Sequence, residues 1–345
     1  MRILTSITAA LAGVIYFSQV WGWLVGNMAP YSADGNVGGP IVAIWAHPSN
    51  SSSPECGGSC EFVKAAYVNW LASAGIRSLP IRFNATPDEW EPILDGVNGM
   101  LLPGGTPLLP DSARLAIKYA GDMNAGGDFF PVWGTCLGWE WMAQAVAGDY
   151  PVLGSGFDAE NLTQPWGLFA GVEDTSRMLS DIPNGLLDRA RREPITANSH
   201  NRGVTPQDFA VSGVDEVFRA LAINSDRQGR KYISAAEAFQ SPMYGVQWHP
   251  EKSQFDWGLD PDGTLHAAVN HSADAVELSQ ALANFFASEA RRSNNAFPFL
   301  AEWEPQMFHN RPITPSGPTT GLRYYIKWDD DGVRLKPASS QSEPQ

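Results

Sequence analysis

The chain has 345 residues, of which 43% are hydrophobic and 17% are charged, a balance typical of a globular protein rather than a disordered one. This length allows one large domain or two small ones, with an ample core in either case. The net charge of −14, from 23 basic and 37 acidic residues, argues against nucleic acid or an anionic membrane as the main partner.

The N-terminal stretch has the pattern of a secretory signal peptide. Arg2 is the only charged residue before Asp34, and an apolar run with small residues follows it over residues 3–17. Residues 20–22 offer a cleavage site, so we expect a signal peptide over 1–22 and a linker over 23–37. The uncharged stretch is also long enough to span a bilayer, which leaves an uncleaved anchor as the alternative.

The rest of the chain carries four Asn-x-Ser/Thr sequons. Each is a weak signal alone, but together with the signal peptide they suit a glycosylated protein of the secretory or vacuolar route. With the signal peptide removed, we expect no contact with a membrane. The candidate acceptors are Asn50, Asn84, Asn161 and Asn270.

From residue 38 onward, strand-like and helix-like patterns alternate. The expected strands are 41–46, 77–83, 99–103 and the run that begins at 129, and the expected helices are 61–74, 87–95, 113–124 and one that ends at 147. Repeated βα units predict an α/β fold with a doubly wound, mostly parallel sheet and flanking helices. In such sheets, ligands bind at the carboxyl ends of the strands.

The second half of the chain is less regular. We expect loops and one helix (184–192) over residues 155–194, strands at 217–223, 232–236 and 243–248, and a closing helix at 274–291. After residue 312 the chain becomes rich in Pro, Ser, Thr and Gly, and from 329 it reads as a polar tail. The sequence therefore predicts one domain over 38–312 and a C-terminal extension over 313–345.

The most informative stretch is Gly134-Thr135-Cys136-Leu137-Gly138, which lies between an apolar strand-like run and a helix-like run. A sharp strand–turn–helix crowds the backbone, so the positions flanking its apex must be small. The free N–H groups of the helix would point at whatever the sulfur attacks, and the helix dipole favours thiolate. We expect Cys136 to be a nucleophile; the alternative is a buried structural cysteine.

Two further features complete a possible site at the same edge. The Gly104-Gly105 pair follows an expected strand, and its N–H groups would join that of Leu137 in an oxyanion hole, unless the pair is a plain turn. His249 and Glu251 are two residues apart around a proline, and in extended backbone such residues point to the same side. The carboxylate would orient the imidazole as a base, unless this is only a surface turn.

The chain has three cysteines, too few for a disulfide framework. In an oxidising compartment Cys56 and Cys60 could pair as a small clip, which would leave Cys136 as the free thiol; the alternative is two unpaired loop cysteines. We expect no zinc site, because no second cysteine pair or His-x₃-His spacing completes four ligands.

Taken together, the motifs resemble those of the class I glutamine amidotransferase-like superfamily, and several narrow the resemblance to the γ-glutamyl hydrolases (folylpoly-γ-glutamate hydrolases). The resemblance covers about residues 40 to 312. It departs from the family at Cys56 and Cys60 and at Trp139 and Trp141. The matching stretches are Phe130-Pro131-Val132-Trp133-Gly134-Thr135-Cys136-Leu137-Gly138, Tyr244-Gly245-Val246-Gln247-Trp248-His249-Pro250-Glu251-Lys252, Leu102-Pro103-Gly104-Gly105, Thr196-Ala197-Asn198 with His200, and Asn284-Phe285-Phe286 followed by Glu289-Ala290-Arg291.

The resemblance implies Cys136 as nucleophile, His249 as general base, Glu251 as its orienter and His200 as a substrate-site residue. It also implies hydrolysis of γ-glutamyl bonds, in folylpoly-γ-glutamates or other small γ-glutamyl substrates, through a covalent thioester without metal or cofactor. It further implies a homodimer with a lysosomal, vacuolar or extracellular location. A glutaminase of the amidotransferase type and a secreted, non-catalytic binding protein on the same scaffold remain the alternatives.

Glu140 lies four residues after Cys136, about one helical turn on, and so shares the sulfur's face of the helix. We expect its carboxylate to accept the α-ammonium of a γ-glutamyl group, with Trp139 and Trp141 shielding it from water. The alternative is a first-turn glutamate that only complements the helix dipole.

Overall fold

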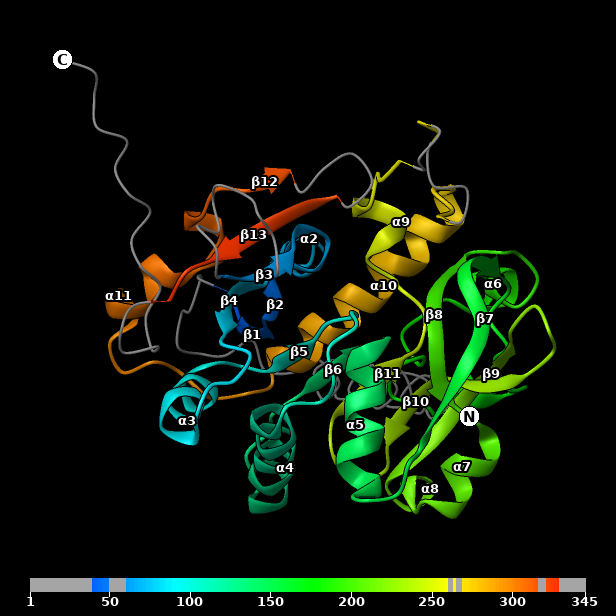
Figure 1. The fold of residues 1–345 in the computed structure, drawn as a ribbon, viewed down its shortest axis with the longest axis horizontal. Coiled ribbons are helices and arrows are strands. Elements are labelled where there is room, and N and C mark those ends of the chain that lie inside the picture. The colour runs from blue at the N-terminus through cyan, green and yellow to red at the C-terminus, as the bar shows by residue number, and fades with distance from the viewer. Residues whose placement is uncertain (1–38, 50–59, 260–262, 265–268, 316–320, 329–345) are drawn as a thin grey trace, which may run out of the picture. The chain divides into compact units, whose positions relative to one another are not determined.

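The computed structural model describes residues 39–49, 60–259, 263–264, 269–315 and 321–328, shown in colour in Figure 1. The expected signal peptide and linker lie outside the described residues, as do Asn50, Cys56 and residues 329–345 of the extension.

A seven-stranded sheet confirms the predicted α/β fold. Its first five strands in spatial order are parallel, and the last two are antiparallel additions at one edge. The carboxyl ends of the parallel strands therefore lie along one edge of the sheet. The strands, in spatial order, are β4 (Arg77–Ile81), β1 (Ile41–Trp45), β5 (Met100–Leu102), β6 (Val132–Thr135), β11 (Met243–Val246), β10 (Lys231–Ala238) and β9 (Phe218–Ser225).

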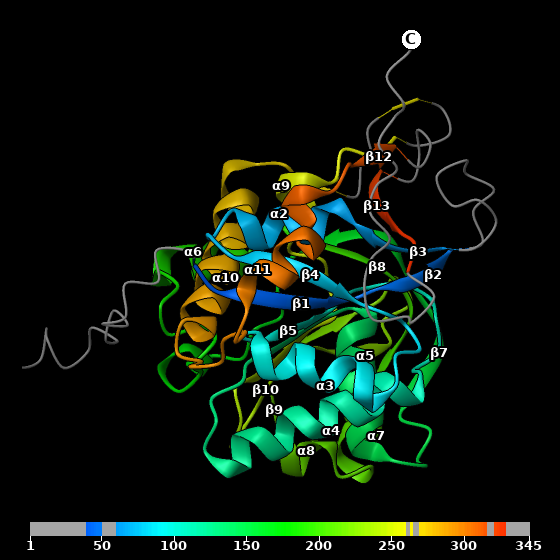
Figure 2. The ribbon, with the colours of Figure 1, turned by 90° about the vertical axis from the view of Figure 1, so that its left-hand side faces the viewer.

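Helices cover both faces of this sheet, as Figures 1 and 2 show. Alternate residues of β1 point to opposite faces, so Val42 and Ile44 belong to one apolar cluster and Ala43 and Trp45 to the other. The first cluster includes α2 (Ala65–Ala72), α6 (Asn184–Ala190), α9 (Lys252–Phe255) and α10 (Ala273–Ala290). The second includes α3 (Pro87–Gly96), α4 (Asp111–Gly126), α5 (Leu137–Ala147), α7 (Pro206–Val211), α8 (Val214–Val217) and α11 (Leu300–Trp303).

Two smaller antiparallel sheets flank the central one. The first runs in the order β12 (Thr314–Pro315), β13 (Leu322–Ile326), β3 (Cys60–Lys64) and β2 (His47–Ser49). Part of the C-terminal extension thus returns to pair with a strand from the start of the domain (Figure 1). The second consists of β7 (Leu153–Gln164) and β8 (Thr196–Val204). Short 3₁₀ helices span Val172–Asp174, Glu304–Gln306 and Phe308–Asn310.

Two local expectations were wrong. Residues 61–64 are not helical, because β3 pairs with β2 on one side and β13 on the other, and the helix begins only at Ala65. Residues 155–164 are not a loop but most of β7, and the strand β8 was not expected at all. β7 is partly exposed and β8 is mostly buried, but both are rich in polar residues, so the period-2 apolar alternation that predicts a strand is weak in them.

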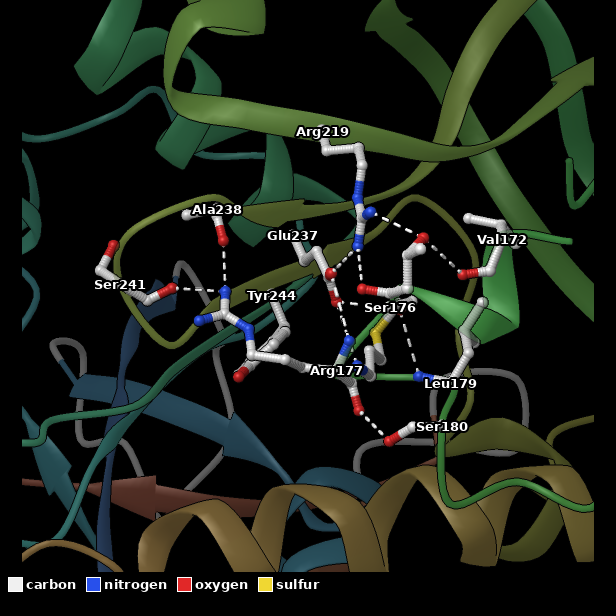
Figure 3. Close-up of polar contacts among 12 residues, drawn as sticks. Val172, Ser176, Arg177, Leu179, Ser180, Arg219, Glu237, Ala238, Ser241 and Tyr244 are labelled. Carbon is white, nitrogen blue, oxygen red and sulfur yellow. Dashed lines mark hydrogen bonds and ion pairs between the residues drawn. The ribbon is translucent and has the colours of Figure 1, made fainter.

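A buried carboxylate ties the loop after residue 171 to the edge of the sheet (Figure 3). Glu237 on β10 accepts hydrogen bonds from Ser176 Oγ at 2.9 Å, from Met178 N at 3.0 Å and from Arg177 N at 3.2 Å. Its other neighbour is the guanidinium of Arg219 on β9. Because a buried charge is tolerated only when it is paired and hydrogen-bonded, these contacts belong together as one structural unit.

Among the residues that the structure describes, no helix combines the length and the apolar composition needed to cross a membrane.

Candidate active site

The strand–turn–helix around Cys136 has the tight geometry that its sequence predicts. Cys136 has φ 53° and ψ −107°, in the positive-φ region that non-glycine residues rarely enter, and α5 begins at the next residue. A Cβ on Gly138 would lie 2.0 Å from the carbonyl oxygen of Leu102, and one on Gly134 would lie 2.7 Å from Trp139 N. Small residues on both sides of the cysteine are therefore a steric requirement.

The ends of three adjacent strands bring the predicted residues together. Gly104 follows β5, Cys136 follows β6 and His249 follows β11, and these strands are neighbours in the sheet. A Cβ on Gly104 would lie 2.6 Å from His249 Cε1 and 3.2 Å from Cys136 Cβ, which bounds the separation of those two atoms at about 5.8 Å. Glycine at position 104 thus allows the imidazole and the cysteine to approach one another.

The imidazole of His249 is oriented as expected, although by a different backbone. Its Nδ1–H donates to Glu251 Oε1 at 2.8 Å, which leaves Nε2 as the acceptor. The expectation of extended backbone was wrong for Glu251, which has φ −65° and ψ −23° where the chain turns into α9. The hydroxyl of Tyr67 on α2 lies 3.4 Å from the same Nδ1. Burial lowers the pKa of His249, and the Glu251 carboxylate acts against that shift.

The protonation state of Cys136 differs from the expectation. The residue is only 4% exposed, and burial raises the pKa of its thiol well above the usual range, with the Glu140 carboxylate adding to the rise. The Leu137 N–H at the start of α5 favours thiolate, but it does not outweigh burial. The resting sulfur is therefore a neutral thiol, and a base must take its proton before it can attack.

The backbone donors expected to form an oxyanion hole are not all free. The Gly104 N–H donates to the Tyr67 hydroxyl at 2.8 Å. The Leu137 N–H is directed at the Cys136 sulfur and favours its thiolate. The Gly105 N–H has no backbone acceptor among the described residues. The Leu137 donor thus already lies beside the nucleophile, whereas Gly104 becomes available only if Tyr67 releases it.

The carboxylate of Glu140 is buried close to the sulfur. Its Oε1 accepts from Gln247 Nε2 at 3.0 Å, and the same nitrogen lies 3.7 Å from Cys136 Sγ. Its Oε2 accepts no hydrogen bond and lies 3.5 Å from Arg202 Nε. Burial raises the pKa of Glu140, and Arg202 and Gln247 oppose that shift. Glu140 Oε2 can therefore accept a hydrogen bond from a ligand close to the nucleophile.

The expected shielding of Glu140 by its two neighbouring tryptophans is not found. The Trp139 ring packs against Gly245 and Phe218, and the Trp141 ring against His47 and Phe83. These rings extend the core beneath the sheet edge, while Gln247 and Arg202 provide the immediate polar surroundings of the carboxylate.

His200 on β8 reaches the same region. Its Nδ1–H donates to the carbonyl oxygen of Arg202 at 2.7 Å, which makes Nε2 an acceptor, and that buried nitrogen has no hydrogen-bond partner. Its ring packs edge-on against Tyr232 with the centroids 4.6 Å apart. Because burial lowers the pKa of His200 to about 4, the ring is neutral near pH 7.

Three residues of the site were not singled out from the sequence. Gln247 could have been found, because it precedes His249 by two positions and lies on the same strand end. Tyr67 lies within the expected helix 61–74, and nothing in the local sequence indicated that its hydroxyl reaches the site. Arg202 lies on the strand β8, which was itself not expected, so no local signal placed it beside Glu140.

The remaining expectations concern modification and metals. Cys60 is disulfide-bonded and Cys136 is free, whereas Cys56, the expected partner of Cys60, lies outside the described residues. Asn84 and Asn161 are exposed. The side chain of Asn270 is engaged, since its Nδ2 donates to the Pro194 carbonyl at 2.7 Å. Within the described ranges, His, Cys, Asp and Glu side chains form no group of three that could hold a metal ion.

Comparison with known proteins adds independent evidence. The family model for class-I glutamine amidotransferases matches residues 60–261. Gamma-glutamyl hydrolase B of Dictyostelium discoideum is 33% identical over 81% of this chain and 79% of its own length. Gamma-glutamyl hydrolase of Homo sapiens is 35% identical over 77% of this chain and 82% of its own length. Gamma-glutamyl hydrolase 1 of Arabidopsis thaliana is 29% identical over 74% of this chain and 73% of its own length. The chain therefore belongs to the class I glutamine amidotransferase family and, within it, to the γ-glutamyl hydrolases.

Proposed function

We propose that this protein hydrolyses γ-glutamyl bonds, with Cys136 as nucleophile, His249 as general base and acid, and Glu251 as the group that orients His249. The observation that carries the proposal is the placement of Cys136 and of the His249–Glu251 pair at the ends of two adjacent parallel strands. Family membership supplies the substrate class, which includes γ-glutamyl peptides and folylpoly-γ-glutamates.

The first half of the reaction forms a thioester. His249 Nε2 takes the thiol proton as Cys136 Sγ attacks the γ-carbonyl carbon, and the N–H groups of Leu137 and Gly105 are proposed to stabilise the oxyanion. The C–N bond then breaks, and His249 returns its proton to the leaving nitrogen. Because the resting sulfur is a thiol, this order keeps it unreactive until a substrate is bound.

The second half regenerates the enzyme. A water molecule loses a proton to His249 Nε2 and attacks the thioester carbon, and the C–S bond breaks. The proton on His249 then returns to the sulfur, and the product leaves with a free γ-carboxylate. Glu251 stays hydrogen-bonded to Nδ1 throughout and stabilises the imidazolium that forms in each half.

Glu140 is proposed to bind the α-nitrogen of the γ-glutamyl residue. Its Oε2, which accepts no hydrogen bond, can accept an N–H from either an α-ammonium or an α-amide, which are the two forms this nitrogen takes in γ-glutamyl peptides and in polyglutamates. The neutral His200, whose buried Nε2 also has no hydrogen-bond partner, is proposed as a second acceptor at the substrate site.

The test is an assay of purified protein on paired γ-glutamyl and α-glutamyl amides of the same amine. We expect turnover of the γ-linked compound only, and intact-mass spectrometry should show a transient acyl adduct on Cys136. The Cys136→Ala variant should lose turnover and adduct while its unfolding temperature stays within a few degrees of wild type. Turnover that survives this substitution would exclude Cys136 as the nucleophile.

We further propose that the protein enters the secretory pathway and acts outside the cell or in a vacuole or lysosome. The N-terminal pattern and the exposed sequons at Asn84 and Asn161 support this. N-terminal sequencing and a glycosidase mobility shift after expression in a eukaryotic host test it, and an intact Met1 without a glycan would contradict it. A homodimer is proposed on family resemblance alone, and light scattering tests it.

A further inference from the structure

The positively charged side chain of Arg202 lies beside Glu140. Arg202 Nε lies 3.5 Å from Glu140 Oε2, and the Arg202 side chain is 25% exposed whereas that of Glu140 is 2% exposed. The guanidinium thus lies between a buried carboxylate next to the nucleophile and the solvent. None of the proposed chemical steps uses it.

The Arg202 backbone is held by hydrogen bonds, whereas its guanidinium group has few contacts. Its carbonyl oxygen accepts the Nδ1–H of His200, and the residue pairs with Ser155 across β7 and β8. Apart from the ion pair with Glu140, the guanidinium makes no hydrogen bond or ion pair with any described residue. An arginine that only stabilised the fold would be expected to hydrogen-bond to neighbouring carbonyl or carboxylate groups, as Arg227 in the turn between β9 and β10 does with residues of β7.

The substrate supplies a partner for this head group. A γ-glutamyl residue carries its α-carboxylate free in every substrate of the class, whereas its α-nitrogen is either an ammonium or an amide. The site presents, in order, the Cys136 sulfur, the Gln247 amide, the Glu140 carboxylate and the Arg202 guanidinium, each within 4 Å of the next. In the substrate, the α-nitrogen and the α-carboxylate are both attached to the α-carbon, two methylene groups from the reactive carbonyl, so neighbouring groups of opposite charge can bind them side by side.

We infer that Arg202 is the residue that recognises the α-carboxylate of the γ-glutamyl residue attacked by Cys136. The planar guanidinium can bind a carboxylate through two parallel N–H donors, and its remaining N–H stays directed at Glu140. Arg202 and Glu140 then form a charge pair complementary to the α-carboxylate and the α-nitrogen of the substrate. This inference rests on the proposed function and adds the group that distinguishes a γ-glutamyl residue from a simple acyl chain.

The experiment compares three acyl groups on one fluorogenic amine. The γ-glutamyl amide has both α-substituents, the 4-aminobutyryl amide lacks the carboxylate, and the glutaryl amide lacks the nitrogen. Arg202→Gln removes the charge. Arg202→Lys keeps a positive charge beside Glu140 but lacks the two parallel N–H donors of the guanidinium. Arg227→Gln is the matched control, since this arginine pairs with Asp158 away from Glu140.

We expect Arg202→Gln to lower kcat/KM for the γ-glutamyl and glutaryl amides by about ten- to a hundredfold, as for loss of a charge-assisted contact. The value for the 4-aminobutyryl amide should change by less than about threefold. Arg202→Lys should fall between wild type and Arg202→Gln, and Arg227→Gln should match wild type on all three compounds.

Two outcomes would overturn the inference. An equal loss on all three amides would make Arg202 a structural residue. A loss confined to the two amides with an α-nitrogen would mean that Arg202 acts only by keeping Glu140 ionised. A wild-type enzyme with no turnover would refute the proposed function instead. Calorimetric binding of the γ-glutamyl amide to Cys136→Ala, with and without Arg202→Gln, then still decides the inference, because unchanged binding contradicts it.

Discussion

Replacing Glu140 by glutamine should make Cys136 more reactive toward a simple alkylating agent while making the enzyme slower on its substrate. The carboxylate is one cause of the raised thiol pKa, so its removal favours thiolate. The same carboxylate is the proposed acceptor for the substrate α-nitrogen, so its removal weakens substrate binding. The two measurements should therefore move in opposite directions.

The size of the first effect follows from the contacts of Gln247. Its Nε2 lies 3.7 Å from Cys136 Sγ and 3.0 Å from Glu140 Oε1, so sulfur and oxygen are at most about 6.7 Å apart. At an effective dielectric constant of about 20, two charges at that distance repel by about 2.5 kcal/mol, or a factor of about 60 in the equilibrium between thiol and thiolate. Arg202 would lose its counter-ion in the variant, and its charge would act in the same direction.

The assay measures the rate of iodoacetamide labelling at pH 8, below the raised thiol pKa, by intact-mass spectrometry. The thiolate fraction should rise by about 60-fold, but a less basic thiolate is a weaker nucleophile, with a Brønsted slope near 0.5. A net acceleration of roughly eightfold is expected. On γ-glutamyl amides, kcat/KM should fall by about ten- to a hundredfold, since a charge-assisted hydrogen bond contributes about 1.5–3 kcal/mol.

The control is Asp122→Asn, which makes the same charge change on the exposed face of α4, where Asp122 forms an ion pair with Lys118. Labelling of this variant should match wild type. If Glu140→Gln is labelled no faster than Asp122→Asn, the charge of Glu140 does not help to hold the thiol neutral. If labelling is faster but turnover is unchanged, Glu140 does not bind the substrate nitrogen.

Three further substitutions test other parts of the structure. Glu251→Gln should lower kcat by about 10²–10⁴ and move the acid limb of the kcat/KM profile to lower pH, since the Glu251 carboxylate raises the pKa of His249; a shift to higher pH would contradict this. Gly138→Ala should reduce the free energy of unfolding in urea by about 1–3 kcal/mol or more, because the new Cβ would lie 2.0 Å from the Leu102 carbonyl oxygen. Gly126→Ala, with no atom within 4 Å of its Cβ, should not reduce it. Glu237→Ala should cost about 3–5 kcal/mol in the same measurement without changing KM, because it removes the counter-ion of Arg219 and leaves three donors without their acceptor.

Several features of the site could be predicted from the sequence because their causes are local. Gly134 and Gly138 flank Cys136 because a strand that turns sharply into a helix has no room for a Cβ at those positions. Glu251 can reach His249 because the two are only two positions apart, and the contact forms even though the backbone turns where extended chain was expected. The alternation of strands and helices likewise predicts the parallel sheet that brings these residues to one edge.

Other features depend on residues far apart in the chain, and only the tertiary structure decided them. Residues 61–64 have a helix-compatible pattern, yet they form β3 because strands near positions 47 and 324 supply hydrogen-bond partners. Arg202 lies beside Glu140 only because β8 pairs with β7 next to the central sheet. The same holds for Cys136: its helix N-terminus predicts a thiolate, but desolvation by the surrounding chain outweighs the helix and keeps the thiol protonated. Burial and long-range pairing arise from the whole fold, so no local window of the sequence contains them.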